Sequence, residues 1–81
     1  MTLDQLPIGE SATVLGVDGE PALRMRIEAM GLRAGRRVAV VRRARLGGPL
    51  QVRVGLTDLI IRPVQARLVR LVDAVPGTPP Q

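Results

Sequence analysis

The segment Leu50–Val54 alternates strictly between aliphatic and polar side chains, and no other feature of the sequence constrains the fold more. A period of two is typical of a β-strand with one buried face and one face in water. Leu46–Pro49 predicts a hairpin turn before this strand, and Gly55–Asp58 predicts another turn after it. The neighbouring strands are then Arg36–Arg45 and Leu59–Arg62, which gives a meander of three strands.

Two more strands are predicted nearer the ends of the chain. Ser11–Val17 has the β-branched character of a first strand, and Arg67–Val72 is the last. Pro63–Ala66 is too short for a regular helix and suits one 3₁₀ turn before the last strand. We expect the proline-rich residues 74–81 to be a disordered tail, which leaves residues 1–73 as a single domain.

One helix, Pro21–Met30, is predicted after the first strand, because proline suits the first turn of a helix. Three aliphatic side chains at i, i+4 and i+7 share one of its faces: Leu23, Ile27 and Met30. Gly31 is placed to adopt the left-handed conformation just beyond the helix, with Leu32 packed back against Ile27. The fold class is therefore mainly β, a small five-stranded barrel with one inserted helix.

The composition excludes most catalytic chemistry. None of the 81 residues is cysteine, histidine or aromatic, so disulfides, thiolate metal sites and a histidine general base are absent. Ser11 is the single serine and has no imidazole to activate it. No apolar run approaches the about 18 residues of a membrane-spanning helix, and the N-terminus does not resemble a signal peptide. We expect a cytoplasmic protein that is not an enzyme and takes no cofactor or small-molecule substrate.

The charge is concentrated in the middle of the chain. Residues 24–53 contain nine arginines and a single acid, Glu28. Residues 1–23 contain four acids, and their single basic group is the N-terminal amine. A basic segment suggests an acidic partner, an anionic membrane surface or nucleic acid, although arginine usage also follows codon composition. Five arginines are candidates for phosphate contacts: Arg36, Arg37, Arg42, Arg43 and Arg45. Single-stranded nucleic acid is disfavoured as a partner, because the chain has no aromatic side chain on which bases stack.

Three segments together resemble the FeoA family. They are the helix and turn from Arg24 to Gly35, the small-residue hairpin from Ala44 to Leu50, and the closing strands around Leu59–Arg62 and Val69–Leu71. Arg45 departs from the family pattern, since many relatives have proline there. The resemblance implies an SH3-like barrel and a cytosolic accessory protein of bacterial ferrous iron uptake. The implied partner is FeoB, a membrane transporter with a cytosolic GTP-binding region, which would hold the protein at the inner face of the membrane.

The candidate partner-binding surface is the helix and the turn that follows it. Its residues are Arg24, Met25, Arg26, Ile27, Met30, Leu32 and Arg33. We expect a cleft between helix and barrel, lined by Met25 and Leu32 and rimmed by arginine, that takes an apolar side chain and also permits weak self-association. The competing interpretation is that the aliphatic residues are core and the arginines are merely solvated. The structural turns are Gly31, Gly35, Gly47, Gly48 and Pro49.

No metal site is expected, because the acids are scattered and only Asp18 and Glu20 lie near each other in the sequence. Domains similar to the FeoA family also occur as C-terminal modules of iron- or manganese-dependent repressors. A second interpretation is therefore a stand-alone SH3-like module that binds nucleic acid or belongs to such a repressor. Whether the chain activates, assembles or gates a transporter stays open at this point.

Overall fold

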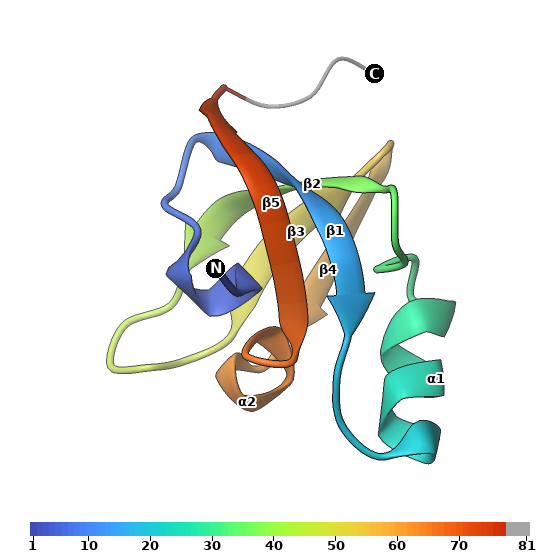
Figure 1. The fold of residues 1–81 in the computed structure, drawn as a ribbon. Helices are drawn as coiled ribbons and strands as arrows, with labels where there is room; N and C mark the ends of the chain where they lie inside the picture. Colours follow the sequence, from blue (N-terminus) through green and yellow to red (C-terminus); the bar gives the residue numbers. More distant parts are fainter. Residues whose placement is uncertain (78–81) are drawn as a thin grey trace.

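Five antiparallel strands form one sheet in the computed structural model, which describes residues 1–77 (Figure 1). The strands lie in the order β4-β3-β2-β1-β5, so the predicted meander β2-β3-β4 is confirmed. Their bounds are β1 Glu10–Val17, β2 Arg37–Arg43, β3 Leu50–Val54, β4 Thr57–Ile61 and β5 Val69–Pro76.

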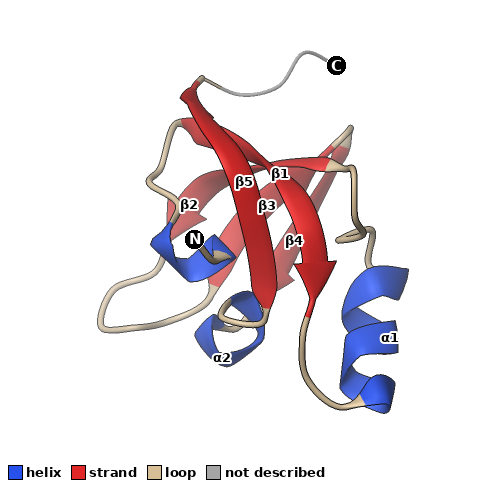
Figure 2. Ribbon diagram, viewed as in Figure 1, coloured by secondary structure: helices blue, strands red, loops and turns tan. Residues whose placement is uncertain are grey.

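Three short helical segments accompany the sheet (Figure 2). They are the 3₁₀ turn η1 at Leu3–Gln5, the helix α1 at Pro21–Ala29 and the single turn α2 at Pro63–Ala66. The predicted helix after the first strand is confirmed as α1. In Figure 1, α1 and the loop between β2 and β3 lie on opposite sides of the view. No helix among residues 1–77 is both long enough and apolar enough to cross a membrane.

The sheet curls because its central strands are irregular. The register of β1 against β5 shifts twice, between Ser11 and Thr13 and between Val14 and Gly16. Extra residues of this kind bend a strand and increase its twist, so the sheet wraps around its own apolar face. On β3 the buried residues alternate with half-buried ones, as the sequence predicts. All five strands, η1 and both helices contribute to one aliphatic core.

The last strand is longer than the sequence predicts. β5 continues to Pro76, because Val75 pairs with Ser11 and Pro76 with Glu10. The N–H of Gly77 also donates to the carbonyl oxygen of Gly9 at 2.6 Å. A tail beginning at residue 74 is therefore wrong for residues 74–76, since proline is tolerated on an edge strand such as β5. The remaining residues of the predicted tail, 78–81, lie outside the described residues.

Two local features also differ from expectation. The turn before β4 contains only Gly55 and Leu56, because Thr57 already pairs with Val54 and Gly55 adopts the positive φ of +61° that such a short turn needs. The turn at Pro63–Ala66 has α-type hydrogen bonds rather than 3₁₀ bonds alone. The N–H of Ala66 donates to a carbonyl oxygen four residues back, that of Arg62, at 2.9 Å.

Candidate partner-binding surface

The helix α1 packs on the sheet through a narrow stripe. Ile27 is fully buried and Leu23 is partly buried against the core, whereas the other side chains of the helix are exposed or half-buried. Met25 lies two residues from both of them, about 200° around a helix axis. Its side chain consequently points away from the core and is 65% exposed.

The predicted cleft between helix and barrel is wrong. Leu32 is fully buried in the core and cannot line a surface groove together with Met25. Ile27 is equally inaccessible, so neither buried residue contacts a partner directly. The competing interpretation, that the aliphatic residues of the helix belong to the core, is correct for Ile27. Met30 is half-buried at the C-terminal end of the helix.

The turn after α1 has the conformations that only glycine adopts easily. Gly31 has a φ of +109° and its N–H donates to the carbonyl oxygen of Glu28 at 3.0 Å. Gly35 has a φ of +91°, and its N–H donates to the carbonyl oxygen of Val14 on β1 at 2.8 Å. These two bonds fix where Arg33 stands relative to α1 and β1.

The arginines around Met25 have no acidic partner. Within residues 1–77 the salt bridges join Arg53 to Asp58, Arg67 to Asp4 and Arg70 to Asp18, and none of them involves a residue of α1. We define the α1 surface by its accessible residues: Arg24, Met25, Arg26, Met30 and Arg33.

Sequence reasoning did not assign Arg36 to this surface. The Nη2 atom of Arg36 lies 3.3 Å from the point that a Cβ atom on Gly55 would occupy, so its guanidinium covers the β3–β4 turn. Val54, whose Cγ1 lies 3.9 Å from the point that a Cβ atom on Gly31 would occupy, belongs to β3, the strand that leads into this turn. Arg36 therefore extends the basic character of the α1 surface toward Leu56, which is exposed. The position of Arg36 beside the β3–β4 turn follows from the long-range pairing of β2 with the β3–β4 hairpin, so local sequence patterns do not indicate it.

Other arginines of the basic segment are engaged in the fold. The guanidinium of Arg37 donates to the hydroxyl of Thr13 at 2.8 Å and to that of Ser11 at 2.9 Å. Arg43 donates to the carbonyl oxygens of Asp4 at 2.9 Å and Leu6 at 2.7 Å, which ties β2 to η1. These hydrogen bonds are structural, so Arg37 and Arg43 are poor candidates for the phosphate contacts considered from the sequence.

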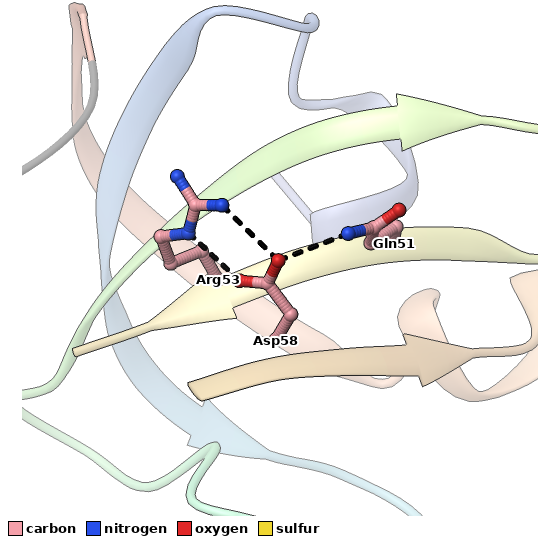
Figure 3. A network of polar contacts seen from close by, with 3 residues as sticks. All are labelled: Gln51, Arg53 and Asp58. Atoms are coloured by element: carbon pink, nitrogen blue, oxygen red, sulfur yellow. Dashed lines mark hydrogen bonds and ion pairs between the residues drawn. The ribbon is translucent and has the colours of Figure 1, made fainter. Parts of the chain in front are cut away.

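A polar network covers the outer face of β3 and β4 (Figure 3). Arg53 binds the carboxylate of Asp58 through Nε at 2.7 Å and Nη2 at 3.1 Å, and the amide of Gln51 donates to the same carboxylate at 2.9 Å. The hydrogen bonds from Arg53 and then Gln51 lower the pKa of Asp58, and the bond to Asp58 raises the pKa of Arg53. This network neutralises Arg53 and leaves the α1 surface as a separate basic region.

Asp18, one of the two acids considered for metal binding, is engaged in an ion pair. Asp18 is paired with Arg70, whose Nε lies 3.1 Å from the carboxylate of Asp18. In the part of the chain that the structure describes, no three carboxylates gather where they could hold a metal ion.

A curled five-stranded antiparallel sheet with a helix after its first strand is the fold of an SH3-like domain. The chain belongs to the FeoA family, because the FeoA domain matches residues 1–72. A search of the curated proteins finds no match.

Solved structures agree with this assignment. The zinc complex of FeoA from Stenotrophomonas maltophilia is 33% identical, with 89% of each chain covered and a TM-score of 0.78; that protein is described as a prokaryotic SH3 domain protein and a candidate activating factor of ferrous iron transport. FeoA from Chlorobium tepidum is 35% identical, with 88% of this chain and 68% of that chain covered and a TM-score of 0.79.

A manganese-dependent transcriptional repressor shares the fold. Its TM-score is 0.82 at 17% identity, and the likeness covers 93% of this chain but only 36% of the repressor. At this identity the likeness concerns the fold alone.

Proposed function

We propose that this chain is a cytoplasmic accessory protein of ferrous iron uptake that binds and modulates FeoB without catalysing a reaction itself. Membership of the FeoA family and the likeness to a protein described in terms of ferrous iron transport support this proposal. The contact would be made with the cytosolic GTP-binding region of the transporter.

The observation that carries the proposal is the composition of the α1 surface. The side chain of Met25 is exposed to solvent on the side of α1 opposite the core. It is flanked by exposed arginines that have no acidic partner. A protruding apolar side chain can fill a pocket on a partner, and surrounding arginines steer an acidic partner surface toward it. Because α1 fully buries only Ile27, most of the helix is available for this contact.

A capture experiment tests the proposal. The wild-type chain is immobilised and incubated with detergent-solubilised membranes that contain FeoB, and we expect it to retain the transporter, with retention falling as salt screens the arginines. Reversing charge with Arg24→Glu and Arg26→Glu should weaken retention about tenfold or more, as loss of a central contact does.

The matched control reverses two other exposed arginines, Arg42→Glu in β2 and Arg45→Glu in the β2–β3 loop. This loop and α1 lie on opposite sides of the view in Figure 1. This control should retain the transporter as the wild type does. Equal loss in both double variants would show that net charge, not the α1 surface, determines binding. No retention by the wild-type chain would contradict the proposed function.

A further inference from the structure

The loop between β2 and β3 presents a leucine that nothing in the described structure covers. The side chain of Leu46 is fully exposed, and its φ is +57°, a left-handed conformation that is uncommon for residues other than glycine and asparagine. The next residue, Gly47, also has a positive φ, +72°. Two positive values in succession are typical of a type I′ turn, whose usual residues are Asn-Gly.

This loop is closed and therefore holds its tip in place. The N–H of Gly48 donates to the carbonyl oxygen of Arg45 at 3.1 Å, and the N–H of Ala44 donates to that of Pro49 at 3.0 Å. At the base of the loop, the guanidinium of Arg43 donates to the carbonyl oxygens of Asp4 in η1 and of Leu6 just after it. The tip is thus a hydrogen-bonded turn with one large, exposed apolar side chain at its end.

The surroundings of Leu46 are basic. Residues 42–49 contain no acid, and the exposed side chains of Arg42 and Arg45 form no salt bridge within residues 1–77. Arg62 is also exposed and follows Ile61, which pairs with Leu50 at the end of the loop. We define the tip surface by Arg42, Arg45 and Leu46.

We propose that the tip surface binds an anionic lipid layer, with Leu46 inserted at the boundary of headgroups and acyl chains and the two arginines bound to lipid phosphates. A closed turn with an exposed leucine at its end suits a broad surface, and the arginines of residues 42–49, a segment without an acid, complement an anionic one. One leucine and a few charges give weak, reversible binding that salt reduces. This inference does not rest on the proposed transporter contact, because it concerns the isolated chain and lipid.

The chain contains its own control for an exposed leucine. Leu56 lies in the β3–β4 turn and is also largely exposed; the guanidinium of Arg36 lies beside this turn, and the nearby acid Asp58 is paired with Arg53. The φ of Leu56 is not positive. If exposure alone caused lipid insertion, Leu56 and Leu46 would behave alike.

Vesicle flotation tests the inference with the full chain. Vesicles of phosphatidylethanolamine and phosphatidylglycerol are compared with neutral vesicles in which phosphatidylcholine replaces the anionic lipid. We expect the wild type to float with the anionic vesicles only. Leu46→Asn, which suits the turn, and the double variant Arg42→Glu and Arg45→Glu should lose this binding. Leu56→Asn and the double variant Arg24→Glu and Arg26→Glu should keep it.

A tryptophan reporter measures insertion directly, because the chain has no tryptophan of its own. The fluorescence of Leu46→Trp should shift to the blue with anionic vesicles, and that of Leu56→Trp should not. Equal binding to neutral vesicles, unchanged binding by Leu46→Asn, or a shift in both reporters would overturn the proposal. So would a Leu46→Asn variant that floats normally but no longer retains the transporter, since the occupant would then be a protein.

Discussion

Asp58 on β4 accepts both hydrogen bonds of the Arg53 fork from the neighbouring strand, at 2.7 and 3.1 Å. A two-point contact of this kind fixes the guanidinium on the outer face of the sheet. Arg53 is thereby removed from the basic residues that are free to meet a partner. The α1 surface and the tip surface both contain arginines that form no salt bridge within residues 1–77. Their elements, α1 and the β2–β3 loop, lie on opposite sides of the view in Figure 1.

The Arg53–Asp58 pair should make stability depend on pH in the acid range. Because the pKa of Asp58 is lowered in the folded state, the pair stabilises the fold above the pKa of the unfolded carboxyl, and this contribution is lost as pH falls through the folded value. Urea denaturation of wild type across the acid range should show this loss. Asp58→Asn should show a smaller loss, and Asp73→Asn, whose acid has no salt bridge within residues 1–77, should follow the wild type.

Gly31→Val should destabilise the domain by roughly 2 kcal/mol, because a β-branched side chain resists the positive φ at this position. A Cβ atom by itself meets no clash, since the nearest atom to it is 3.9 Å away on Val54. Urea denaturation measures the change. Ala34→Val, at an exposed residue in the same turn whose φ is not positive, should change stability by less than about 0.5 kcal/mol. Equal effects would show that φ at Gly31 is not the cause.

Leu46→Asn should stabilise the domain by about 1 kcal/mol, because asparagine adopts the left-handed conformation more readily than leucine. The measurement is again the free energy of unfolding in urea. Leu56→Asn should leave it nearly unchanged, since the φ of Leu56 is not positive. A destabilised Leu46→Asn variant would mean that the leucine makes contacts within the folded chain.

The hydrogen bond between Arg37 and Ser11 should couple β1 to β2. Ser11 is buried, and its hydroxyl is satisfied by the guanidinium at 2.9 Å. A double-mutant cycle with Ser11→Ala and Arg37→Ala should give a coupling energy of about 1 kcal/mol. A coupling energy indistinguishable from zero would show that water satisfies the serine equally well.

Local patterns predicted the elements of this fold well. The alternation at Leu50–Val54 and the aliphatic spacing around Ile27 each follow from one element's own geometry, and the structure has both. The conformation at Gly31 follows similarly from its place after the helix. Such features need no knowledge of distant residues.

Features that depend on distant partners could not be predicted in the same way. The extent of β5 is set by pairing with β1, and the role of Arg37 is set by hydroxyls on another strand. The prediction of a cleft between helix and barrel was wrong for a different reason. Met25 lies opposite the buried stripe of α1, and Leu32 is drawn into the core by the turn at Gly31.

Uptake of radiolabelled ferrous iron tests the central claim most directly. Cells that lack the chromosomal copy of this chain are supplied with the wild type or with the double variant Arg24→Glu and Arg26→Glu. The variant should fold with a stability within about 0.5 kcal/mol of the wild type, as exposed substitutions usually do. We predict that the variant accumulates to the wild-type level yet fails to restore uptake. Full uptake at equal protein level would contradict the account.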